Sequence, residues 1–288
     1  MATKLWVGTS TAGDYSVAAN WSPSGVPIAG DDVILANSSQ DITAGLDQSA
    51  VVLTSFTVDL SYTGLIGSSD SDFLEIAAST VVIGQRRSTS GNFTGSKRFN
   101  LDLGSSTAAQ VKIYGTASSA QTATRQPLRL QASNASTDIT VFSGSVGISD
   151  DSTNSTTIGD LNMVAGSVSI GDSVTMTNLI QNGGSVNSQS SLTTATIKSG
   201  TFNHYDSASA STITTLNCNG GTVNHYATGT ITTLNLNSGT VDLTKTQLAK
   251  TVTTLTADRG TLVTDSGVVT ITNEIQLASS TKATISFT

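Results

Sequence analysis

The two histidines of the chain stand in matching Asn-His-Tyr contexts, at His204-Tyr205 and at His225-Tyr226. The two contexts are about one repeat apart, so we expect each residue of the first to stack on its counterpart in the second. Two imidazoles with Asp206 make a poor metal site without a further histidine or a cysteine pair. Stacked tyrosine rings suit sugar rings or a partner chain, so these four residues form a candidate glycan-binding strip. The alternative is an ordinary ladder of a duplicated rung.

Carboxylates are few and scattered along the sequence. A hydrolase needs two carboxyl groups roughly 5 to 10 Å apart, but Glu75 and Glu274 are far apart in the chain, and Asp31-Asp32 and Asp150-Asp151 lie in turn-like contexts. No Gly-x-Ser-x-Gly elbow is accompanied by a suitable histidine and acid. The single cysteine, Cys218, excludes an internal disulfide and a multi-cysteine metal site. We therefore expect no catalytic residues, no metal and no cofactor.

Basic residues concentrate in one stretch of an acidic chain. The net charge is −7, yet seven of the 13 basic residues lie in 86–129. Such a stretch could orient the chain on an acidic partner, which makes Arg86, Arg87, Lys97 and Arg98 candidate partner contacts; the alternative is a mixed solvated surface. Nucleic-acid binding is not expected, because overall positive charge and interleaved aromatic residues are absent.

These side chains must be positioned by β-structure. Charged residues make up only 11% of the chain and hydrophobic residues 37%, and β-branched apolar residues recur throughout, unlike in disordered chains. A Gly-[Ser/Thr]-[Val/Phe/Leu] pattern returns about every 16 to 22 residues. It begins at Gly144, Gly166, Gly184, Gly200, Gly221, Gly239 and Gly260. This spacing fits the rung of a β-solenoid and is too short for a propeller blade.

The best-aligned rungs place one apolar residue between two threonines, at Ile213, Ile231 and Val252. Side chains alternate across a strand, so these residues should face a shared core while the threonines point outward. The sequence therefore predicts an all-β fold, a parallel β-helix (β-solenoid) with about 18 to 21 residues per rung. We expect a regular β-helix over 141–288, with a C-terminal cap from Glu274. Residues 51–140 are strand-rich but irregular, and form either looser rungs or a separate β-domain.

Residues 1–50 are expected to form an N-terminal cap or docking segment, and they contain both tryptophans. The string from Ala19 to Leu35 holds an Asn-Trp pair, a Gly-Val-Pro turn and an Asp-Asp-Val-Ile strand. It resembles the opening segment of β-helical surface and virion proteins, in which such a string leads into the first coils. This resemblance implies a structural protein of tailed bacteriophages, of the head decoration (cement) or tail-fibre type. Trp6 and Trp21 would either anchor a partner or plug the open end of the solenoid.

The N-terminus lacks the basic and apolar regions of a signal peptide, and no run of residues is apolar enough to span a membrane. We therefore expect a virion protein assembled in the host cytoplasm. The leading hypothesis is a non-enzymatic capsid decoration protein that binds the major capsid protein, as a homotrimer. The first alternative is a tail-fibre or spike adhesin that binds host glycan. The second is a β-helical polysaccharide lyase or hydrolase.

Overall fold

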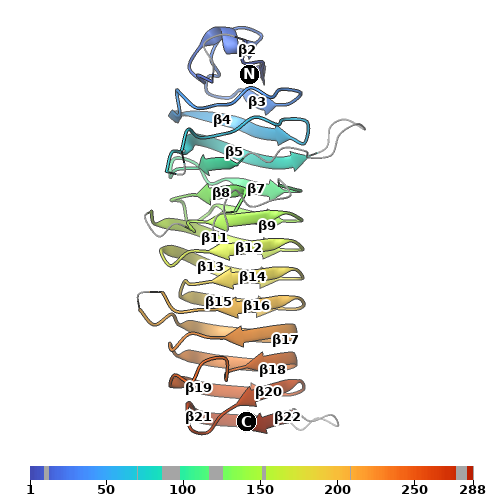
Figure 1. The fold of residues 1–288 in the computed structure, drawn as a ribbon, viewed down its shortest axis with the longest axis vertical. Helices are drawn as coiled ribbons and strands as arrows, with labels where there is room; N and C mark the ends of the chain where they lie inside the picture. The colour runs from blue at the N-terminus through green and yellow to red at the C-terminus, as the bar shows by residue number, and fades with distance from the viewer. Residues whose placement is uncertain are drawn as a thin grey trace.

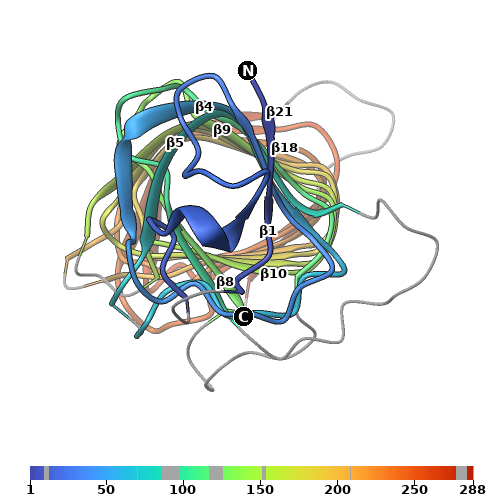
Figure 2. The ribbon, with the colours of Figure 1, turned by 90° about the horizontal axis from the view of Figure 1, so that it is seen from above.

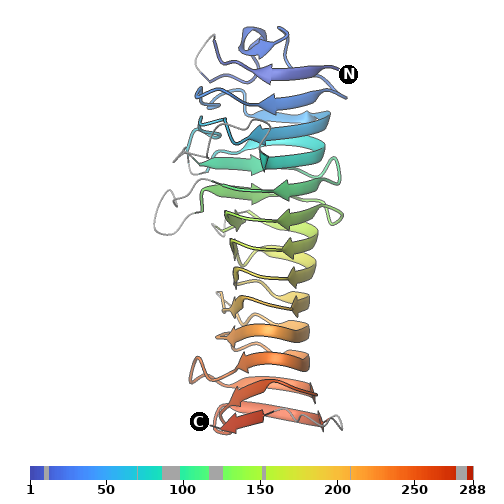
Figure 3. The ribbon, with the colours of Figure 1, turned by 90° about the vertical axis from the view of Figure 1, so that its right-hand side faces the viewer.

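The chain folds into one long parallel β-solenoid. The computed structural model describes residues 1–9, 13–69, 71–85, 98–116, 126–150, 154–207, 209–276 and 284–287. The solenoid has about 10 turns, 56% of the chain is strand, and the described residues form no α-helix. The rungs stack along the long axis, with the N-terminus at one end and the C-terminus at the other (Figures 1 and 3). The predicted parallel β-helix is confirmed.

The N-terminal end is built from short elements that lie over the first rungs. They are β1 (Thr3–Trp6), the 3₁₀ turn η1 (Ala18–Asn20), β2 (Trp21–Ser22) and β3 (Asp32–Leu35). Strand β1 pairs antiparallel with β2 and parallel with β3, and β3 pairs in parallel with β4 (Asp47–Asp59). Seen from above, the dark-blue N-terminal segment lies across the outline of the coil (Figure 2). The N-terminal residues therefore cover one end of the stack.

The irregular region 51–140 pairs with its neighbours on both sides. Its strands after β4 are β5 (Leu74–Gln85), β6 (Phe99–Asp102), β7 (Gln110–Ile113), β8 (Leu128–Gln131) and β9 (Asp138–Val141). Strand β5 pairs in parallel with β4, β6 and β7, and β8 and β9 lead on to β10 and β11. The sequence left open whether this region forms looser rungs or a separate β-domain, and in the structure it forms rungs of the same stack.

The second half of the chain has two parallel columns of strands. The strands are β10 (Ser145–Ile148), β11 (Thr156–Met163), β12 (Ser167–Ile170), β13 (Val174–Gln181), β14 (Ser185–Ser188), β15 (Leu192–Ile197), β16 (Thr201–His204), β17 (Ile213–His225), β18 (Ile231–Asp242), β19 (Lys250–Ala257), β20 (Thr261–Thr264), β21 (Val269–Gln276) and β22 (Thr284–Phe287). Strands β21 and β22 pair in parallel with β19 and β20, so pairing continues into the segment for which a C-terminal cap was predicted.

The core is an aliphatic column along the solenoid axis. Ile213, Ile231 and Val252 are aligned on neighbouring strands and are buried, as predicted. Each buried aliphatic side chain of this kind contributes roughly 1.5 to 3 kcal/mol relative to an exposed one. Since a single rung has no second layer to cover its apolar face, this stabilisation depends on the rungs above and below.

Glycines form one corner of the coil, because backbones of successive rungs come close there. Gly200 has φ of +84°, and a Cβ added to it would lie 2.3 Å from the carbonyl oxygen of Gly184. Glycine alone combines a left-handed φ with this close approach. The glycine repeat seen in the sequence is therefore a consequence of the corner geometry.

Candidate functional site

Tyr205 and Tyr226 stack on the outside of the coil, directly after strands β16 and β17. The register pairs His204 with His225, which brings the two tyrosines one above the other. Their ring centroids are 4.6 Å apart and the rings are nearly parallel, at 14°. Both side chains are partly exposed. The predicted stacking of the two Asn-His-Tyr segments is confirmed.

A hollow of about 220 Å³ lies beside Tyr205. Gln189 occupies the same corner position as Tyr205 one rung earlier, and Gly171 occupies it two rungs earlier. The backbone amide of each of these three residues donates a hydrogen bond to the last residue of the strand on the preceding rung. A Cβ at Gly171 would collide with the carbonyl oxygen of Ser149, so the backbones of these two rungs pack closely at this corner. The hollow is lined by Asp150, Ser169, Ile170, Gly171, Asn187, Gln189 and Tyr205.

Asp150 is held at one side of this hollow by an ion pair. Its Oδ1 accepts a hydrogen bond from Arg129 Nε at 2.8 Å, and its side chain is only 6% exposed. The Arg129 guanidinium in turn lies over the ring of Phe73, 5.2 Å from its centroid. The second carboxylate oxygen, Oδ2, is buried without a hydrogen-bond partner. Buried polar atoms are normally paired, so this oxygen marks the hollow as a candidate ligand site.

His204 and His225 lie inside the coil, which corrects their assignment to the surface strip. Both are fully buried, with their Nδ1 atoms 3.1 Å apart, and His204 Nε2 lies 3.0 Å from the carbonyl oxygen of Ser190. Burial lowers the pKa of His204 to about 4 and that of His225 to about 3. Side chains alternate along β16, so His204 shares the inward face with Phe202, whereas Tyr205 follows the end of the strand. The histidines form a neutral interior pair at neutral pH.

Trp6 and Trp21 are buried in the N-terminal cap and present no ring to a partner. The centroid of Trp21 is 5.1 Å from that of Trp6 and 4.6 Å from that of Tyr15, both in edge-on geometry. Their indole nitrogens donate to backbone carbonyls, Trp6 to Gln40 at 3.1 Å and Trp21 to Tyr15 at 2.8 Å. Of the two roles predicted for these residues, the geometry is that of a plug and not of exposed anchors.

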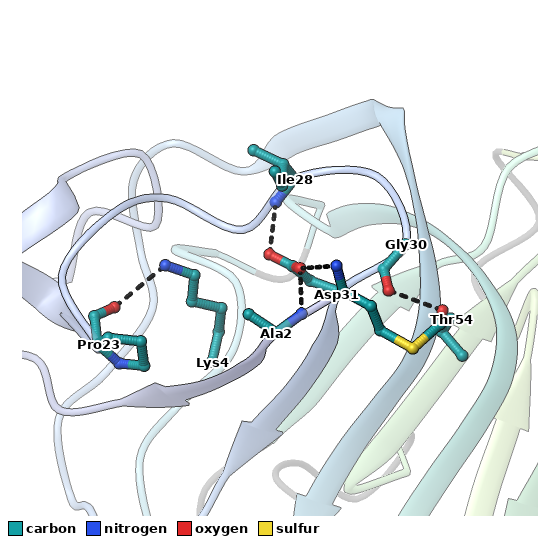
Figure 4. Close-up of polar contacts among 8 residues, drawn as sticks. Ala2, Lys4, Pro23, Ile28, Gly30, Asp31 and Thr54 are labelled. Carbon is teal, nitrogen blue, oxygen red and sulfur yellow. Dashed lines mark hydrogen bonds and ion pairs between the residues drawn. The ribbon is translucent and has the colours of Figure 1, made fainter.

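Asp31 fastens the first residues of the chain to this cap (Figure 4). Its carboxylate accepts hydrogen bonds from the amides of Ala2 at 2.7 Å and Ile28 at 3.2 Å. Nearby, Lys4 Nζ donates to the carbonyl oxygen of Pro23 at 3.2 Å. Asp31, the first residue of the acidic pair at 31–32, therefore has a structural role in the cap.

The predicted basic docking stretch is only partly described. Arg86, Arg87 and Lys97 lie outside the described residues. Arg98 is partly exposed just before β6, and its carbonyl oxygen accepts a hydrogen bond from the Ile66 amide at 3.1 Å. Arg129, another basic residue of this stretch, is buried and forms an ion pair with Asp150.

A column of carboxylates on neighbouring rungs was missed by the sequence analysis. Asp47 aligns with Glu75, and Glu75 with Asp102, so successive residues are about one strand spacing, or 4.8 Å, apart at their Cα atoms. Desolvation, followed by the charges of Asp47 and Asp102, raises the pKa of Glu75. Glu75 and Asp102 line a hollow of about 300 Å³ together with Gln131. The sequence did not reveal this column, because these rungs are longer than those of the regular half and the acids do not recur at the spacing of the glycine pattern.

Within the part of the chain that the structure describes, no group of three or more His, Cys, Asp or Glu residues could hold a metal ion. No helix in that part is long and apolar enough to cross a membrane. Comparisons with protein families, with curated proteins and with solved structures find no match to this chain.

Proposed function

We propose that the chain is a non-enzymatic structural protein of a tailed-phage particle, and that it decorates the head by binding the major capsid protein. The observation that carries this proposal is the unbroken parallel pairing of the rungs from β3 to β22. Each rung satisfies the backbone of the next, and the N-terminal end is covered by a cap. Such a rod suits a durable surface component, and the N-terminal segment resembles that of virion β-helices.

The outer face of the second half of the rod is suited to contacts with a partner. One outward column consists only of small hydroxyl residues over eight rungs. They are Ser145, Ser167, Ser185, Thr201, Thr222, Thr240, Thr261 and Thr284. A flat, uncharged column of this kind is suited to side-by-side packing of copies, which is the form that the proposed homotrimer requires.

Counting the chain in purified particles tests the proposal. A decoration protein is expected in numbers that match the symmetric sites of the shell. Arg86, Arg87 and Arg98 changed to Glu should abolish binding to undecorated capsids. Arg259→Glu is the control for a single charge reversal outside this stretch, because Arg259 is exposed and already pairs with the adjacent Asp258 at 3.3 Å. Unchanged occupancy of the triple variant would remove the docking role of the basic stretch.

A tail-fibre or spike adhesin is the second candidate, and the Tyr205–Tyr226 stack with its hollow favours it. Such a protein would be present in only a small set of copies at the tail, which separates it from a decoration protein. A polysaccharide lyase or hydrolase is a third candidate. It is supported only by the aligned carboxylates Glu75 and Asp102. Release of reducing ends from a polysaccharide, lost in Glu75→Gln, would be required for that function.

A further inference from the structure

We propose that the hollow beside Tyr205 binds a single neutral carbohydrate ring, stacked on Tyr205 and hydrogen-bonded to Asp150. This inference deepens the glycan-binding alternative, on which its biological role rests, and it is independent of the decoration role. It differs from the strip expected from the sequence in its residues, because neither histidine takes part and Tyr226 has only a supporting position.

Tyr205 offers one ring face to a ligand. Its other face is covered by Tyr226 on the following rung, at a centroid distance of 4.6 Å. The free face is directed toward the preceding rungs, where the same corner is occupied by Gln189 and then by Gly171. A ring stacked on this face would lie at the level of Gln189, whose exposed side chain can turn aside, and it would extend the tyrosine stack by one member. The C–H face of a pyranose suits such an aromatic platform, since it is apolar and flat.

Asp150 supplies an acceptor that the protein itself does not use. Its Oδ1 is engaged by Arg129, whereas its Oδ2 is buried without a partner, in a side chain that is only 6% exposed. A ligand hydroxyl that enters the hollow could donate to Oδ2. The positive charge of Arg129 already balances the carboxylate, so a neutral hydroxyl fits this position better than a cation.

Amide groups complete the lining with donors. The Oδ1 atom of Asn187 accepts a hydrogen bond from Asn203 Nδ2 at 2.8 Å, which leaves the Asn187 NH₂ group as the part that can donate to a ligand. Gln189 adds an exposed amide, and Ser169 adds a hydroxyl. An aromatic face, a fixed acceptor and several donors match a ring that is apolar on its faces and hydroxylated at its rim.

The test is titration of the full-length chain with methyl glycosides of glucose, galactose and N-acetylglucosamine, followed by saturation-transfer NMR and calorimetry. We expect at least one glycoside to bind, Tyr205→Ala to weaken it about tenfold or more, and Tyr205→Phe to keep it. Tyr226→Ala is the matched control, because it removes the same ring from the covered side of the stack. Circular dichroism and the thermal midpoint establish that each variant is folded.

Asp150→Asn should weaken binding by about tenfold as well, and Gln189→Ala replaces it as the test of the polar lining if the Asn variant does not fold. The proposal is overturned if no glycoside binds the wild-type chain, if Tyr226→Ala weakens binding as much as Tyr205→Ala, or if only Ca²⁺ or an amine binds. None of these results bears on particle copy number, so the failure of this inference is distinct from failure of the decoration role.

Discussion

Acidification is expected to destabilise the solenoid through the buried pair His204 and His225. Both imidazoles lie in the dry core with their Nδ1 atoms 3.1 Å apart, and burial lowers both pKa values, to about 4 and about 3. In the unfolded chain each histidine titrates near its ordinary pKa of about 6.5. As pH falls through that value, the unfolded chain takes up protons that the folded chain does not, so the free energy of unfolding falls.

The size of the effect follows from this difference. At about pH 5 the folded pair is still largely neutral, whereas each unfolded histidine is protonated and gains about 2 kcal/mol. Two histidines therefore lower the free energy of unfolding by about 4 kcal/mol between about pH 7.5 and about pH 5. Asp206 lies nearby; burial opposes its ionisation, but hydrogen bonds from Thr228 and Ser211 lower its pKa, so it stays ionised over this range.

The assay is guanidinium unfolding followed by circular dichroism at several pH values within this range. The double variant His204→Gln, His225→Gln is the comparison, because glutamine keeps a polar group at each position but does not titrate. Its free energy of unfolding should change little with pH, while that of the wild type falls. A wild type that loses less than about 1 kcal/mol, or a double variant that loses as much as the wild type, would refute the buried neutral pair.

Three further perturbations test other parts of the structure. Gly200→Ala should lower the free energy of unfolding more than Gly30→Ala in a denaturant titration. Both glycines have φ of +84°, but only at Gly200 would the added Cβ meet a carbonyl oxygen, at 2.3 Å, and equal losses would contradict the tight corner. Glu75→Gln should raise the thermal midpoint at neutral pH, because the raised pKa of Glu75 shows that its charge is disfavoured in the folded chain. The part of that gain that comes from the charges of Asp47 and Asp102 should shrink in high salt, whereas the part that comes from desolvation should remain. The whole gain should vanish at pH values low enough to protonate the carboxyl group, and a gain that persists there would argue against a disfavoured charge. Trp21→Ala should cost about 3 to 5 kcal/mol of unfolding free energy, and a cost below about 1 kcal/mol would argue against the plug.

The regular half of the coil could be predicted because its constraints repeat at nearly constant spacing. Ile213, Ile231 and Val252 lie at equivalent positions in similar rungs, and each is buried as the alternation of side chains requires. The glycine pattern was equally informative, since Gly200 and its counterparts meet the same steric demand at one corner. Local chemistry and global packing agree in these rungs, which is why the sequence pattern alone specified them.

The carboxylate column could not be found in this way. Asp47, Glu75 and Asp102 are about 28 residues apart, against about 19 in the regular half, so a search for the shorter period does not align them. Their alignment depends on how loops are inserted between strands, which the periodicity does not encode. The aligned strands bring these acids side by side, although they are far apart in the sequence.

The inward position of His204 had a usable signal. In Thr201-Phe202-Asn203-His204 the phenylalanine stands two residues after the corner glycine and must face the core, so the residue two positions later faces the core too. The weight given to histidine as a chemical group obscured this alternation. Asp150 had no such signal, because its role depends on Arg129 from an earlier rung.

The solenoid places its core and its surface chemistry on adjacent residues. His204 is fully buried and Tyr205 is partly exposed, although one peptide bond joins them. Stability is carried by the inward column, whereas the outward residues of the same rungs can change with little effect on packing. A surface variant such as Gln189→Ala should therefore alter ligand binding without altering the unfolding free energy, and an interior variant such as His225→Gln should do the reverse. If the two effects prove inseparable, the rungs do not divide core from surface in the way that both the decoration role and the carbohydrate site require.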